Sequence, residues 1–206
     1  MIRARLCALL CLIPLIGGCV MLERAPAALT CDSDLAGHWV PLAGSASGSS
    51  PLNRDDYADV DAQCRVTLVD AKQPNERPSF TALGFRIGEA RYLALTQAAM
   101  RELFNDRAPA KPSALPDTAV LPMRYRIVDD VLELQTPDAT ALQALIKQGE
   151  LKALDTGSAY LLQGDEAALN ALMTERADLF GVPAPVDDPG GPGSGVLRLK
   201  RTGAAP

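Results

Sequence analysis

Histidine, aromatic side chains and positive charge are all scarce in this 206-residue chain. It has one histidine, 4% aromatic residues and a formal net charge of -5. A Ser–His–Asp or Cys–His catalytic centre would therefore have to use His38. The negative net charge argues against nucleic-acid binding, because a phosphate-binding surface needs a basic electrostatic field.

The chain also lacks the short motifs that mark several catalytic and phosphate-binding sites. It contains no H-E-x-x-H and no S-x-x-K sequence. The glycine-rich stretch 190–195 lacks the lysine and the following helix of a phosphate-binding loop, and the stretch 44–48 has alanine where a nucleophile elbow needs serine. The sequence therefore identifies no catalytic residue and implies no cofactor.

Acidic residues crowd one short segment, where Asp55, Asp56, Asp59 and Asp61 fall close together. An EF-hand loop that began at Asp59 would need glycine at the position of Cys64. We therefore interpret the segment 54–61 as a solvated acidic loop and predict no metal site.

The amino terminus has the pattern of an export signal. Arg3 and Arg5 precede an uncharged, almost wholly apolar run over 6–18. This run is too short to cross a bilayer as a helix, which needs about 20 residues. The pattern is typical of a secretory signal peptide, which we place at 1–18.

The end of this run, Ile16-Gly17-Gly18-Cys19, resembles the lipobox of bacterial lipoproteins. The resemblance implies cleavage after Gly18, a diacylglycerol on the Cys19 thiol and an acylated amino terminus, which together anchor a protein stably to a membrane. Because Val20 stands where an aspartate favours retention in the inner membrane, the resemblance implies an outer-membrane location facing the periplasm. The alternative is an ordinary signal peptide followed by a cysteine of no special role.

The remaining cysteines form an even pair. Of the five cysteines, Cys7 and Cys11 leave with the signal and Cys19 carries the lipid, so that Cys31 and Cys64 remain. In an oxidising compartment this pair predicts a disulfide, worth roughly 3–4 kcal/mol in the chain-entropy model. Zinc is the competing interpretation, but two cysteines and one histidine make a poor ligand set.

Beyond Cys19 the chain divides into a lipidated tether over 19–30 and one globular domain over 31–206. Proline- and glycine-rich stretches at 107–118 and 181–195 predict long surface loops within that domain.

Strand patterns dominate the domain. The pattern predicts two amphipathic helices, at 138–148 and 165–179, and a shorter helical piece at 97–105. The predicted strands cover 35–42, 64–70, 79–87, 90–96, 121–128, 131–136, 158–163 and 196–201. We expect an α+β fold, mainly antiparallel β, with a sheet or small barrel of about 7–8 strands and the two longer helices packed on it.

The tripeptide Gly37-His38-Trp39, at the start of the first predicted strand, resembles the G-x-W motif that opens lipocalins. The resemblance implies a tryptophan at a closed barrel end beneath an arginine of the last strand, here Arg198 or Arg201. The second lipocalin motif, T-D-Y, is absent, and the helix predicted at 138–148 interrupts the strand order of that family.

Three functions remain open. The first is a non-catalytic structural or interaction module, anchored to the membrane through its lipid and contacting envelope proteins. The second is a lipocalin-like carrier of a small apolar ligand. The third is an envelope hydrolase that uses two carboxylates of unequal pKa, for which the sequence identifies no pair.

Overall fold

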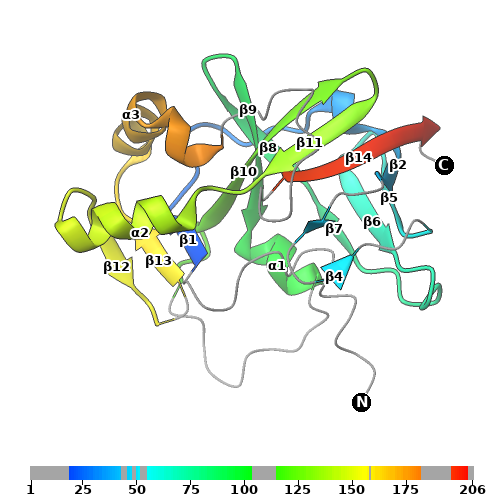
Figure 1. Ribbon diagram of the computed structural model, residues 1–206, viewed down its shortest axis with the longest axis horizontal. Coiled ribbons are helices and arrows are strands. Elements are labelled where there is room, and N and C mark those ends of the chain that lie inside the picture. Colours follow the sequence, from blue (N-terminus) through cyan, green and yellow to red (C-terminus); the bar gives the residue numbers. More distant parts are fainter. Residues whose placement is uncertain are drawn as a thin grey trace.

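The computed structural model describes residues 19–42, 46–47, 50–51, 55–103, 115–157, 159–181 and 196–203. The predicted signal peptide over 1–18 and most of the two predicted loops over 107–118 and 181–195 lie outside these residues. Within them, 12 strands join into one open, mixed sheet, and two short strands form a separate ribbon (Figure 1).

Ten strands of the sheet lie side by side in the order β12-β13-β1-β10-β11-β14-β2-β5-β6-β7. Strand β9 also pairs with β10, and β8 pairs with β9. The strands of the sheet are β1 (Cys19–Leu22), β2 (Gly37–Pro41), β5 (Tyr57–Val60), β6 (Arg65–Val69), β7 (Ser79–Thr81), β8 (Leu83–Ile87), β9 (Ala90–Thr96), β10 (Val120–Val128), β11 (Val131–Gln135), β12 (Ala153–Asp155), β13 (Ala159–Leu162) and β14 (Val196–Gly203). The separate ribbon is β3 (Ala46–Ser47) with β4 (Ser50–Pro51).

The three helices begin and end close to their predicted positions. They are α1 (Gln97–Leu103), α2 (Ala139–Gln148) and α3 (Glu166–Glu175). The Asp138 carboxylate accepts a hydrogen bond from the Ala141 N–H at 2.9 Å, and Asp165 caps α3 in the same way. Gly149 ends α2 with a φ of 78°, which a glycine adopts without strain.

The strands predicted at 121–128 and 131–136 are confirmed and pair as an antiparallel hairpin, β10 with β11. Its turn residues Asp129 and Asp130 have φ values of 50° and 59°, as a two-residue hairpin turn requires. The predicted strand 79–87 is divided into β7 and β8, and Ala82 between them donates its N–H to the Cys64 carbonyl at 2.8 Å.

Strand β10 is the point where the sheet divides. One edge of β10 pairs with β9 from Val120 to Tyr125. The other edge pairs with β1 at Val120 and with β11 only from Arg124 onward. Residues 121–123 therefore lie between two diverging partners, and Pro122 in this stretch has no N–H to donate.

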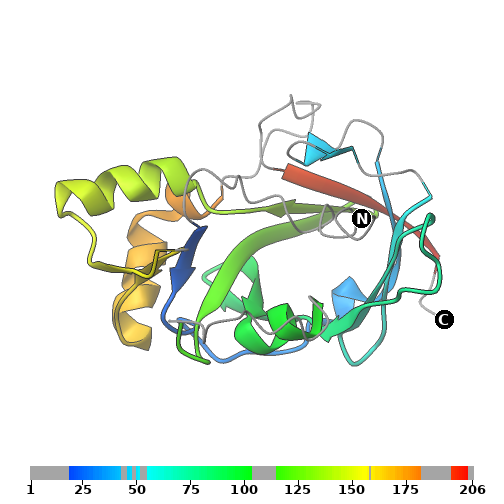
Figure 2. The ribbon, with the colours of Figure 1, turned by 90° about the horizontal axis from the view of Figure 1, so that it is seen from below.

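Two apolar clusters cover the two faces of the sheet. The cluster beneath α2 and α3 contains Leu22, Leu142, Leu169 and Met173. The cluster on the other face, which we call the concave cluster, contains Trp39, Leu68, Leu121 and Leu199 among its buried residues. Figure 2 shows α2 and α3 at one end of the molecule beside β1, and β2, β5, β6 and β14 at the other end.

The expected size and shape of the sheet need correction. It has more strands than the 7–8 predicted and is open rather than a closed barrel. The extra strands β5 and β12 are short, and β5 falls in the segment interpreted as a solvated acidic loop. There Ala58 and Val60 are buried while Tyr57 and Asp59 are more exposed, a period-two pattern that the aspartates conceal.

The expected tether over 19–30 also differs from the structure. Residues Cys19–Leu22 form β1, which pairs in parallel with β13 and is buried over Val20, Met21 and Leu22. Further on, Thr30 forms a bridge with Gly84. This stretch therefore belongs to the folded body and does not extend away from it as a spacer.

Among the described residues, no helix combines the length and the apolar character that crossing a bilayer would require.

Candidate binding site

The concave face of the sheet holds an apolar cavity of about 150 Å³. Nine strands contribute to its wall, namely β2, β5 to β11 and β14, together with α1. Representative lining side chains are Trp39 of β2, Leu68 of β6, Leu93 of β9, Met123 of β10, Leu134 of β11 and Leu199 of β14. An apolar cavity of about this volume can hold a small molecule such as benzene.

The cavity wall contains no charged side chain among the described residues that line it. Its polar members are Gln135 and Thr136, at the end of β11. Thr136 continues the alternation of Leu132 and Leu134, so its side chain is on the concave face at that end. A lining of this kind suits a small apolar molecule or an alkyl chain and provides no partner for a buried charge.

Trp39 is a buried residue of the cavity wall. Its ring is 1% exposed, and its indole N–H donates to the Leu35 carbonyl at 2.8 Å. The Arg201 guanidinium carbon lies 4.6 Å from the centroid of the ring, which makes the predicted arginine–tryptophan contact. Arg201 also donates to the Asp34 carbonyl oxygen at 2.7 Å, which fixes the guanidinium in place.

Gly37 is needed beside this contact. Its φ is +150°, and a Cβ placed there would lie 3.2 Å from the Arg201 side chain. In the G-x-W tripeptide, Trp39 therefore provides the ring that Arg201 packs on, and Gly37 leaves space for the Arg201 side chain. Arg198, the other candidate, instead donates to the Glu133 carboxylate at 2.9 Å.

A charged network borders the wall at Tyr125. The Tyr125 hydroxyl donates to the Asp32 carboxylate at 2.5 Å, and Arg91 lies 3.4 Å from the same oxygen. Burial by itself would raise the pKa of Asp32, but hydrogen bonds from Tyr125 and the Asp34 N–H, together with the charge of Arg91, lower that pKa overall. Burial, reinforced by the Asp32 carboxylate, raises the pKa of Tyr125.

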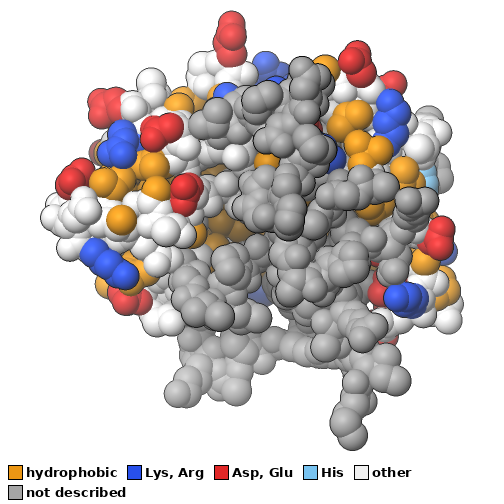
Figure 3. All heavy atoms as spheres, in the orientation of Figure 1, with side chains coloured by type: hydrophobic (Ala, Val, Ile, Leu, Met, Phe, Trp, Pro, Cys, Tyr) orange, Lys and Arg blue, Asp and Glu red, His pale blue; other side chains and the backbone are white. Residues whose placement is uncertain are grey.

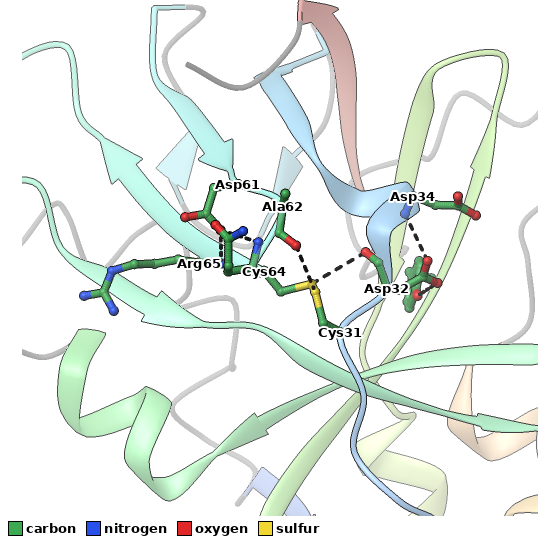
Figure 4. Close-up of a disulfide and its surroundings, with 9 residues drawn as sticks. Cys31, Asp32, Asp34, Asp61, Ala62, Cys64 and Arg65 are labelled. Atoms are coloured by element: carbon green, nitrogen blue, oxygen red, sulfur yellow. Dashed lines mark hydrogen bonds between the residues drawn. A yellow bond between two sulfur atoms is a disulfide. The ribbon is translucent and has the colours of Figure 1, made fainter.

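The predicted disulfide is confirmed and lies directly beside this network (Figure 4). Cys31 and Cys64 are joined with a Cα–Cα distance of 5.6 Å. The bond connects the segment before β2 to the turn between β5 and β6. It therefore holds Asp32, the residue after Cys31, close to the concave cluster.

His38 lies outside the cavity. Strand alternation places it on the face opposite Trp39, where its Nδ1 lies 2.6 Å from the Asp59 carboxylate and its ring centroid lies 4.7 Å from that of Tyr57. His38 and Asp59 are neighbours on paired strands β2 and β5. The arrangement is a cross-strand polar pair at the surface.

The clustered aspartates do not converge on a common point. Asp61 accepts from the Arg65 N–H at 2.8 Å, Asp56 accepts from the Ala71 N–H at 3.1 Å, and Asp59 pairs with His38. In the described part of the chain, no group of three histidine, cysteine or acidic side chains is placed to hold a metal ion.

Cys19, the predicted lipidation residue, is the first residue of β1. Its side chain is partly buried and packs against the concave cluster. Burial raises the pKa of its thiol to about 11.

The surface seen in Figure 3 has charged side chains of both signs interspersed over its described part.

The cavity itself was not predicted, because its lining residues share no local sequence pattern and meet only through strand pairing.

Compared with known proteins, the chain matches no family model, no curated protein and no solved structure.

Proposed function

We propose that this protein is a lipoprotein of the bacterial envelope that binds one small apolar ligand in the cavity of its curved sheet. The lipobox resemblance supports an anchor at Cys19 in the outer membrane, on its periplasmic side. The single observation that carries the binding function is the cavity of about 150 Å³, whose wall is apolar except for Gln135 and Thr136. Such a wall favours alkyl groups over charged or strongly hydrated ligands.

The two other functions have less support. A carboxylate hydrolase needs two acids facing one another in a cleft, and the described lining of the cavity contains no acid. A purely structural module would have no use for an unfilled apolar cavity, because unfilled core volume lowers stability. Contact with envelope proteins remains compatible with ligand binding.

Trp39 gives a direct test of ligand binding, because it is the only tryptophan in the chain and it lines the cavity. We expect bromohexane to quench Trp39 fluorescence saturably in the full chain carrying Cys19→Ser, purified without membrane lipid. Hexane should compete with the quencher. Bromine quenches tryptophan on contact, so the signal reports occupancy at the cavity wall.

Two matched substitutions of half-buried leucines provide the control. Leu134→Phe reduces the cavity volume and should weaken bromohexane binding at least fivefold. Leu145→Phe makes the same change on α2, in the cluster on the other face, and should leave binding within twofold of the parent. Quenching that rises linearly without saturation, or that is equal in both variants, would remove the basis for a binding function.

The anchor is tested separately with radiolabelled palmitate in growing bacteria. The wild-type chain should incorporate label and fractionate with outer membranes, and Cys19→Ala should do neither. Cys19→Ala that retains the label would show that the lipid is attached elsewhere.

A further inference from the structure

The proposed anchor has no spacer between lipid and fold. Cleavage after Gly18 would make Cys19 the first residue, and Cys19 is already paired with Ala159 in the sheet. The next three residues, Val20, Met21 and Leu22, are each at most 3% exposed. The lipid would therefore leave the protein from a point fixed within the folded body.

The direction in which the Cys19 side chain points decides where the lipid begins. Alternation along β1 puts Val20 and Leu22 in the cluster beneath α2 and α3, and it puts Cys19 and Met21 against the concave cluster. The sulfur atom therefore faces the side of the sheet that contains the cavity.

The cluster against which Cys19 packs also contains residues of the cavity wall. On the edge of β10 between its contacts with β1 and β11, none of the described strands pairs with residues 121–123. Two of these residues, Leu121 and Met123, line the cavity and belong to or pack against the same cluster as Cys19 and Met21. A chain attached at Cys19 would meet this apolar surface before it reached solvent.

We propose that one acyl chain of the lipid on Cys19 occupies the cavity in the same molecule. This inference rests on the proposed anchor and the proposed binding site, and it identifies the ligand as a saturated alkyl chain supplied in cis. A tethered chain has a high effective concentration at a neighbouring site, so it displaces free lipid of equal intrinsic affinity. The other chains of the anchor remain in the membrane, where more than one chain is needed for stable attachment.

The test follows the acyl chain itself in the full-length protein. Cells are fed a fatty acid that carries a diazirine near its methyl end, which enters both the Cys19 lipid and the phospholipids. After irradiation, monomeric protein is isolated and its crosslinked peptides are identified by mass spectrometry. We expect the Cys19 peptide to be joined through its acyl chain to peptides from β9, β10 or β11.

The other outcomes are distinguishable. Phospholipid adducts on the same strands, without a link to the Cys19 peptide, would overturn occupancy in cis and leave the binding function standing. An absence of any adduct on the cavity strands would overturn both. An unmodified Cys19 peptide would overturn the anchor, and with it this inference.

Variants show whether the crosslink depends on the cavity. Leu134→Phe should lower the yield of the link between the Cys19 peptide and the cavity strands at least fivefold, and Leu145→Phe should leave it unchanged. Equal yields in the two variants would show that the chain lies outside the cavity. In addition, bromohexane should quench Trp39 in lipidated wild-type protein at least tenfold more weakly than in Cys19→Ser.

Discussion

Asp32 illustrates how one residue connects several parts of this molecule. It follows Cys31 of the disulfide, accepts a hydrogen bond from Tyr125 of β10 and lies near Arg91 of β9. Its side chain is 16% exposed, so its charge is screened less than a surface charge would be. Hydrogen bonds of this kind, to a charged and partly buried group, contribute more to stability than bonds between neutral groups.

The Tyr125–Asp32 bond predicts a specific dependence of stability on pH. Because the pKa of Asp32 is lowered by folding, its contribution is present above the unfolded value of about 3.9 and is lost as the pH falls through the folded value. Because the pKa of Tyr125 is raised, its contribution is present below about pH 10 and is lost as the pH rises further.

Tyr125→Phe should therefore lower the free energy of unfolding by about 2 kcal/mol at neutral pH. The loss should shrink below about pH 4 and above about pH 10. Urea denaturation at several pH values measures both effects, and Tyr160→Phe, a half-buried tyrosine in the other cluster, is the control. A destabilisation that stays constant across the pH range would show that packing, and not the hydrogen bond, is what Tyr125 contributes.

Some contacts between single residues can be predicted from the sequence. Counting cysteines was enough to pair Cys31 with Cys64, since the others were assigned to the signal and the lipid. The resemblance of one tripeptide implied that Arg198 or Arg201 lies over Trp39, and in the structure it is Arg201. The network at Asp32 was missed because its members are 59 and 93 residues apart in the sequence.

At the scale of elements, the helices and hairpins were predictable because their signals are local. Asp138 and Gly149 delimit α2 in the sequence itself, and the residues between β10 and β11 favour a tight turn. Strand β1 was not predictable in this way. Its four residues begin at the cysteine of the lipobox-like sequence and resemble the start of a spacer. Only their pairing with β13, some 140 residues later, makes them a strand.

The importance of β1 can be measured by truncating one side chain. Leu22 is 0% exposed at the centre of the cluster beneath α2 and α3, so Leu22→Ala should cost about 3 kcal/mol of unfolding free energy. Leu154→Ala is the matched control, since Leu154 on β12 is 47% exposed and should change stability by less than about 0.5 kcal/mol. Equal, small effects in urea denaturation would mean that residues 19–30 form a tether after all.

At the scale of the whole molecule, the cavity depends on curvature. Its walls come from β2, β5 to β11 and β14. Local turns explain hairpins such as β10 with β11, but no local pattern encodes the pairing of β11 with β14 or of β14 with β2. The division of the sheet at β10 follows from the same long-range pairing. Sequence reasoning could therefore predict an apolar, mainly β domain but could not predict whether its core was filled.

The most direct measurement uses the single indole of Trp39 as a probe of what occupies the cavity. Bacteria grown on ¹³C-labelled fatty acid would supply lipidated protein whose acyl protons can be selected in a nuclear Overhauser experiment in nanodiscs. An apolar chain in the cavity predicts cross-peaks between Trp39 ring protons and labelled methylene protons, and these should weaken in Leu134→Phe. Trp39 cross-peaks to protein protons alone would contradict the proposal that this sheet holds an apolar chain.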